Sequence, residues 1–88
     1  MRVEGHTDNM PISTNEFASN WQLSTARAAN VTELLVSAVG ISPEKTATVG
    51  YGQYRPVASN STEVGRAKNR SINIIVINSS LNKLEINK

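Results

Sequence analysis

Residues 20–40 read NWQLSTARAANVTELLVSAVG, and this stretch carries the longest helical pattern in the chain. Ser19 and Asn20 are both good N-cap residues, and Gln22 follows Ser19 by three positions, so the helix should begin near Asn20 or Trp21. Gly40 predicts the end of the helix. Apolar residues recur at the spacing of one helix face: Leu23, Ala26, Val31, Leu34, Leu35 and Ala38.

Short segments on both sides of this helix predict strands. Residues 2–5 resemble the end of a strand that runs into a polar loop, and residues 46–51 are rich in β-branched and aromatic types. Residues 71–77 form the strongest strand pattern, and their near-continuous apolar run favours a central position in the sheet. Residues 61–69 predict one or two helical turns. The order is β-α-β-(α)-β, which indicates an α/β fold.

The length of 88 residues allows one domain. We assign residues 1–78 to this domain and residues 79–88 to a C-terminal tail. The tail carries Leu81, Leu84 and Ile86 without a cap, and we expect it to be frayed helix or disordered. A sheet of three strands with one long helix would leave one face poorly covered, so we expect elements to be missing at the N-terminus.

Composition excludes several classes of function. The chain has no cysteine, which removes disulfides, thiolate zinc sites and cysteine nucleophiles. The sequence contains no apolar run near the roughly 20 residues that span a bilayer. The net charge of +2 is too weak to indicate nucleic-acid binding, and no aromatic residue is interleaved with the basic segment 66–70 to stack on bases. That segment is more typical of a solvated face or a loop anchor.

Arg27 is the most informative single position. Helical spacing places it between Leu34 and Ala38, in the middle of the apolar face, and it lies in the second turn, where the helix dipole disfavours a cation. An unpaired buried charge costs several kcal/mol, so Arg27 should have a carboxylate partner or a ligand. The alternative is that its guanidinium extends along the face to reach water.

Asp8 is the natural counterpart of Arg27. It follows the first strand, and the loop at the carboxyl end of a strand lies beside the start of the following helix in α/β folds. Two interpretations remain open. The carboxylate and the guanidinium could simply neutralise each other, or they could lie apart and bind the ammonium and the carboxylate of one zwitterionic ligand.

Other chemistry has weaker support. Glu4, His6 and Asp8 alternate as metal ligands would along a strand, but the chain holds no second histidine, and we expect no metal and no cofactor. A serine triad would depend on His6 alone, so we expect no catalytic residues. Gly50-Tyr51-Gly52 is not a nucleotide-binding fingerprint. Trp21, beside the helix start, is expected to be a packing residue.

The ordered set of motifs resembles the OmpA-like peptidoglycan-binding family over residues 3–77. The motifs are VEGHTD at 3–8, NWQLSTARA at 20–28, GYG at 50–52, Arg55-Pro56, Asn60 and GRAKNR at 65–70. Within the family, Asp8-Asn9-Met10-Pro11-Ile12 and the long loop that follows are most similar to flagellar motor stator proteins. The resemblance implies an α+β sandwich with a small mixed sheet. Family members generally have a strand and a helix before the segment that begins here.

The resemblance implies a non-covalent anchor that binds the stem peptide of peptidoglycan at diaminopimelate. Asp8 would bind the ammonium and Arg27 the carboxylate. Thr7, Asn20 and Leu23 would line the same pocket, and Arg70 would approach from the loop before the third strand. The domain would lie in the periplasm or on the cell-wall side of the membrane, in a membrane-anchored bacterial protein.

The partners implied are peptidoglycan, a second copy of the chain and, in a full-length stator protein, a membrane partner. Two other classes stay open. A dimerisation module is favoured by the exposed sheet edge expected of a short sheet. A wall-degrading enzyme would need a second histidine or a pair of acids, and only Glu4 or Glu16 accompanies Asp8.

Overall fold

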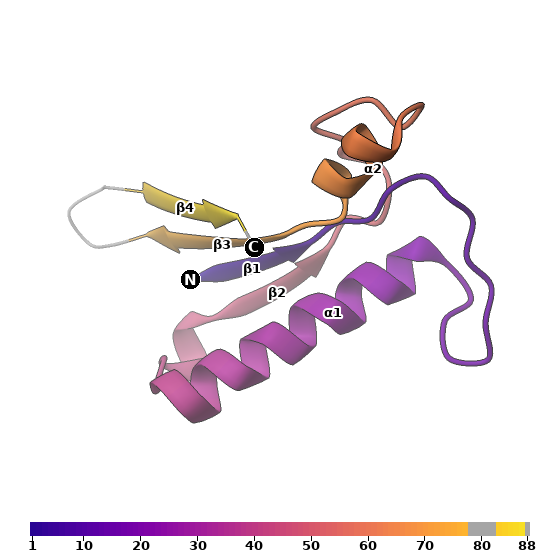
Figure 1. Cartoon of the computed structure of the whole chain (residues 1–88). Coiled ribbons are helices and arrows are strands. Elements are labelled where there is room, and N and C mark those ends of the chain that lie inside the picture. Colours follow the sequence, from indigo (N-terminus) through magenta and orange to yellow (C-terminus); the bar gives the residue numbers. More distant parts are fainter. Residues whose placement is uncertain (78–82, 88) are drawn as a thin grey trace.

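A computed structural model of the chain describes residues 1–77 and 83–87. Two α-helices and four strands follow one another in the order β1, α1, β2, α2, β3 and β4 (Figure 1). Their bounds are Arg2–Gly5 for β1, Asn20–Leu34 for α1, Ala47–Gly50 for β2, Glu63–Asn69 for α2, Ile72–Ile77 for β3 and Lys83–Asn87 for β4. The α/β class and the order of the first five elements are as predicted.

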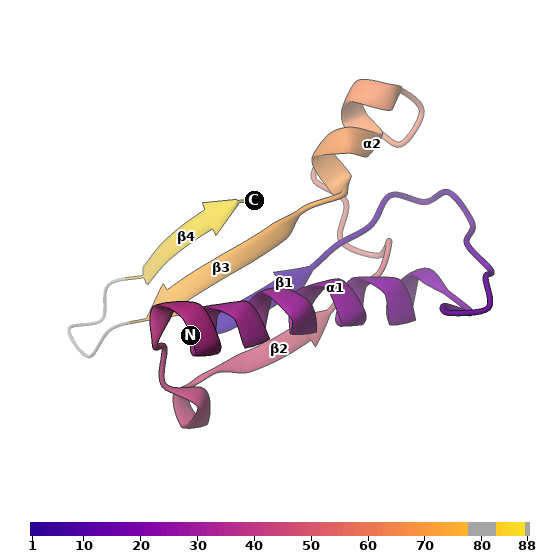
Figure 2. The ribbon, with the colours of Figure 1, turned by 60° about the horizontal axis from the view of Figure 1, so that its bottom comes forward.

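The strands form one mixed sheet in the order β2-β1-β3-β4. Strand β1 pairs in parallel with β2 and antiparallel with β3, with Val3 opposite both Thr48 and Ile74. Strand β4 pairs antiparallel with β3. Helix α1 is the crossover between the two parallel strands, and it lies across one face of β1 and β2 (Figure 2). The central position predicted for β3 is confirmed, and its residues 72–75 are buried on both faces of the sheet, whereas Val76 is 36% exposed.

Helix α1 begins where the sequence predicted. Ser19 is the N-cap, and its side chain accepts a hydrogen bond from the backbone N–H of Gln22. The helix continues as a π-helical turn, Leu35–Val39, and ends at Gly40, whose φ of 86° is the left-handed conformation that favours glycine. A short 3₁₀ turn, Pro43–Lys45, then leads into β2. None of the described helices is both long and apolar enough to cross a membrane.

The buried face of α1 differs from the predicted one. Asn20, Ser24 and Ala28 are its buried residues, whereas Leu34 is 60% exposed and Arg27 is only half-buried. The reason is close approach between helix and sheet. A Cβ added at Gly5 would collide with the backbone of Ser24, and one at Gly50 would collide with Thr25, so only small side chains fit between α1 and these strands. The core cluster consists of Val3, Ala28 and Ile72, with Val31 and Leu35 packed against it.

The prediction for the tail is wrong over residues 83–87. These residues are a strand and not frayed helix or disorder, because β3 offers them an unpaired edge. The sheet therefore has four strands where three were predicted. Leu81 lies outside the described residues. The assignment of 79–88 to a tail separate from the domain stays a prediction.

Candidate functional site

The site is built at the carboxyl end of β1, where the chain leaves the sheet in a long loop. The backbone N–H of Thr7 donates to the carbonyl of Gly52, which fixes the start of this loop against the loop after β2. The Asp8 side chain accepts a hydrogen bond from the N–H of Met10 at 3.0 Å. Asn20, in the first turn of α1, donates through Nδ2 to the carbonyls of Asp8 and Met10. The helix start therefore holds the loop that carries Asp8.

A cavity of about 220 Å³ lies between this loop, α1 and the end of α2. All six residues that the sequence analysis assigned to the site line it, together with three apolar residues of the loop. The complete lining is Thr7, Asp8, Met10, Pro11, Ile12, Asn20, Leu23, Arg27 and Arg70. The sequence motif did not single out Met10, Pro11 and Ile12 as lining residues. Their position between two motif segments was the available signal.

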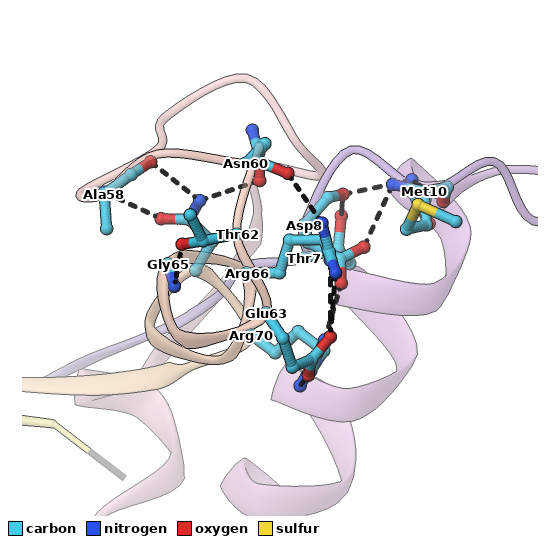
Figure 3. A network of polar contacts seen from close by, with 12 residues as sticks. Thr7, Asp8, Met10, Ala58, Asn60, Thr62, Glu63, Gly65, Arg66 and Arg70 are labelled. Carbon is cyan, nitrogen blue, oxygen red and sulfur yellow. Dashed lines mark hydrogen bonds and ion pairs between the residues drawn. The ribbon is translucent and has the colours of Figure 1, made fainter.

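The cation that pairs with Asp8 is Arg70. Arg70 Nη1 lies 2.8 Å from Asp8 Oδ2, and the Asp8 residue is 7% exposed (Figure 3). Arg70 is the C-cap of α2, immediately before β3, so the predicted approach from this connection is correct. The neutralising pair of Asp8 with Arg27 is not formed. That interpretation is wrong because α2 brings a second guanidinium to the same carboxylate.

Arg27 also lines the cavity. Among the residues that the structure describes, none forms an ion pair or a side-chain hydrogen bond with its guanidinium. It lies one turn beyond Leu23 on α1 and is half-buried at the border of the packed face. A guanidinium carries five N–H donors in a planar fork that matches a carboxylate. Arg27 is therefore able to bind an anionic group that enters the cavity.

Arg70 is also held from outside the cavity. Its Nη2 lies 2.7 Å from Glu63 Oε1, and Glu63 Oε2 accepts from Arg66. The hydrogen bond from Arg70, followed by that from Arg66, lowers the pKa of Glu63 below its usual value. The two carboxylates, Glu63 first, raise the pKa of Arg70, which is charged at any physiological pH. Glu63 was not among the predicted site residues, although it stands two helical turns before Arg70.

The loop from Gly52 to Asn60 is anchored by Asn69 of α2. Asn69 is 2% exposed and accepts from the backbone N–H groups of Val57 and Ala58, while it donates to Ala58 and Asn60. Arg66 donates to the carbonyl of Asn60. Of the two roles left open for segment 66–70, a solvated face or a loop anchor, Arg66 and Asn69 have the second.

Trp21 is not buried as a packing residue would be. It is 49% exposed and stacks on Tyr54, with ring centroids 4.9 Å apart. The two rings line a second cavity of about 200 Å³, which shares Asn20 with the first. Asn20 also donates to the side chain of Gln53, so the two cavities have one amide in common.

The weakly supported metal interpretation has no geometric basis in the described part of the chain. His6 Nε2 lies 3.8 Å from Glu4 Oε1, but Asp8 is bound to Met10 and Arg70 instead. Residues 1–77 and 83–87 contain no group of three histidines, cysteines or acids placed to hold a metal ion. His6 stacks on Tyr51, with ring centroids 5.2 Å apart.

Comparison with known proteins agrees with this architecture. The model of the OmpA family matches residues 1–70. The chain belongs to the OmpA family. It is 47% identical over 75 residues to motility protein B of Bacillus subtilis, which covers 85% of the chain and 29% of that protein. It is 45% identical over 74 residues to the peptidoglycan-binding protein ArfA of Mycobacterium tuberculosis, which covers 84% of the chain and 21% of that protein.

Among solved structures, the cell wall anchor of the T6SS from Pseudomonas aeruginosa is similar to this chain. The TM-score is 0.74 and the identity 42%, with 81% of this chain and 49% of that chain covered. The chain spans less than a third of the length of motility protein B and of ArfA. The resemblance to the OmpA-like family that the sequence motifs indicated is confirmed.

Proposed function

We propose that this domain binds peptidoglycan non-covalently and holds its stem peptide at a residue whose side chain ends in both an ammonium and a carboxylate, as diaminopimelate does. The Asp8 carboxylate accepts hydrogen bonds from the ligand ammonium, and the guanidinium of Arg27 donates to the ligand carboxylate. Thr7, Asn20 and Leu23 line the same cavity. The observation that carries the proposal is that Asp8 and Arg27 line one cavity, where Asp8 pairs with Arg70 and no described side chain pairs with Arg27.

The charges of the cavity support a zwitterionic ligand. Arg70 contacts Asp8 through one nitrogen only, so the carboxylate keeps acceptor positions for a further donor. Arg27 brings a positive charge that none of the described side chains offsets. A ligand with one positive and one negative end would satisfy both groups at once. A ligand with only one charge would satisfy one of them.

The biological role that fits this binding is anchoring. Relatives include motility protein B, a peptidoglycan-binding protein and a cell wall anchor, and they support a domain that ties a larger assembly to the wall. We assign the domain to the periplasm or the cell-wall side of a bacterial membrane. The flagellar motor stator is the assembly favoured by the similarity to motility protein B, with a membrane stator partner in the full-length protein. The domain acts by binding, without catalysis.

Dimerisation is a second candidate function. Two exposed apolar side chains support it, Leu34 at the end of α1 and Val39 at the end of the π-helical turn, since apolar surface of this kind is commonly buried by association. A concentration series measured by light scattering tests it. A mass that rises from one chain to two chains with concentration supports a homodimer, and a constant single-chain mass contradicts it.

The test of wall binding uses purified sacculi from a bacterium whose wall contains diaminopimelate. The domain should sediment with the sacculi, and the supernatant should contain no released muropeptides. Release of muropeptides would show an enzyme instead. A domain that stays in solution at all sacculus concentrations contradicts the proposal.

A further inference from the structure

The guanidinium of Arg70 lies between two carboxylates (Figure 3). Its Nη1 donates to Asp8 at 2.8 Å, and its Nη2 donates to Glu63 at 2.7 Å. One positive charge is therefore shared by two negative ones. Asp8 lines the cavity, whereas Glu63 does not.

The two carboxylates differ in how they are held. Asp8 is 7% exposed, and its Oδ1 is fixed by the N–H of Met10. The Glu63 side chain is 66% exposed, but its Oε2 accepts from Nε and Nη2 of Arg66 at 3.3 and 3.1 Å. Arg66 is held in turn by the carbonyl of Asn60. Glu63 is thus kept in place on the outer side of Arg70 in spite of its exposure.

This arrangement limits how Arg70 can contact Asp8. A guanidinium next to a single carboxylate tends to bind it with two parallel N–H groups. Because Glu63 takes Nη2, Arg70 offers only Nη1 to Asp8. A carboxylate has about four lone-pair positions, and Asp8 uses two of them, one for Met10 and one for Arg70. The remaining positions stay open to a donor in the cavity.

We propose that Glu63 is a positioning residue that acts through Arg70 to keep Asp8 open to a ligand ammonium, and so sets the preference of the site for a zwitterionic side chain. The proposal rests on the proposed function. Without Glu63, Arg70 turns onto Asp8 with both terminal nitrogens and neutralises it. An ammonium then competes with a full guanidinium fork for the same oxygens.

The test measures binding of two peptides by calorimetry. One is a stem tripeptide that ends in meso-diaminopimelate, and the other is the same peptide with the side-chain ammonium acetylated. Glu63→Gln should weaken the first by about fivefold, within the range of coupling between contacting residues, and leave the second nearly unchanged. Glu33→Gln, an exposed change of the same charge on α1, is the matched control and should affect neither.

A double-mutant cycle shows whether Glu63 acts through Arg70. In the Arg70→Gln background, Glu63→Gln should have no further effect on the affinity for the unmodified peptide. If Glu63→Gln still lowers the affinity in this background, Glu63 acts through its charge and not through Arg70, which overturns the proposal. Equal affinity of Glu63→Gln and the parent also overturns it.

A crystal structure of ligand-free Glu63→Gln shows the contact between Arg70 and Asp8 directly, without the peptide. Both terminal nitrogens of Arg70 should contact Asp8, and an Arg70 that still uses Nη1 alone overturns the proposal. A parent protein that binds neither peptide contradicts the proposed function, which the calorimetry separates from failure of the Glu63 variant alone.

Discussion

Arg70 Nη1 lies 2.8 Å from Asp8 Oδ2, so the cation beside this carboxylate comes from 62 positions further along the chain. The pair joins the loop after β1 to the end of α2 and closes one side of the cavity. Arg27 is left as a guanidinium that the described residues do not partner. The two arginines of the cavity therefore differ: Arg70 pairs with Asp8, and Arg27 has its guanidinium available for a ligand.

Asp8→Asn should cost binding and little stability. Arg70 keeps its contact with Glu63 when the Asp8 charge is removed, and an asparagine oxygen is still able to accept from Met10. Because Arg70 is partly exposed, the loss of the pair should change the melting temperature only slightly. Thermal melts and calorimetry with the diaminopimelate tripeptide measure the two effects. A large fall in the melting temperature that Asp8→Asn with Arg70→Gln restores would show a structural ion pair instead.

Ser24→Ala should destabilise the domain although it keeps the residue small. Ser24 is fully buried, and its Oγ accepts from the N–H of Gly52 while it donates to Trp21. The change leaves a buried N–H without an acceptor, which costs about 1–3 kcal/mol. Urea denaturation measures the loss. Ser37→Ala, at an exposed position, is the control, and equal stability of the two variants would contradict the role of Ser24.

The contribution of Glu63 to stability should depend on pH. Arg70 and then Arg66 lower the pKa of Glu63 below its usual 4.5. A depressed folded-state pKa gives stability that is present above pH 4.5 and is lost as the pH falls through the folded value. The parent should therefore exceed Glu63→Gln in stability by a constant amount near neutral pH, and the difference should close in acid. A gap that is the same at pH 7 and pH 3 would show that the charge of Glu63 is not its source.

Deleting residues 83–88 should destabilise the domain. These residues include β4, which pairs with β3 from Asn73 to Ile77. Without β4, an edge of the most apolar strand is exposed, and the surface hidden in the folded state falls. Urea denaturation should give a lower midpoint and a smaller m-value. A deletion of Lys88 alone is the control. An unchanged midpoint after the longer deletion would show that β4 adds nothing to the fold.

Sequence patterns predicted the local elements well because their signals are local. The Ser19 cap, the Gly40 stop and the apolar run of β3 each depend on neighbouring residues. The six site residues also come together, since the loop after β1 and the start of α1 lie at one end of the sheet. Their role in binding peptidoglycan stays a prediction.

Features that depend on distant contacts were not predictable in this way. The Asp8–Arg70 pair depends on where α2 packs, which helical spacing in α1 cannot indicate. The buried face of α1 is set by Gly5 and Gly50 on two different strands. Polar and apolar residues alternate from Lys83 to Asn87, which is a local strand signal that the tail prediction did not use. What the sequence could not show is that the free edge of β3 provides their pairing partner.

Calorimetry of Arg27→Lys with the diaminopimelate tripeptide measures whether the guanidinium of Arg27 binds the ligand carboxylate. Lysine keeps the charge but lacks the planar fork, so a bidentate contact with the ligand carboxylate is lost. The affinity should fall by about 1.5–3 kcal/mol, or roughly 10- to 150-fold, while the helical signal and the melting temperature stay near those of the parent. An Arg27→Lys protein that binds the tripeptide as tightly as the parent would contradict recognition of a zwitterionic side chain by Asp8 and Arg27.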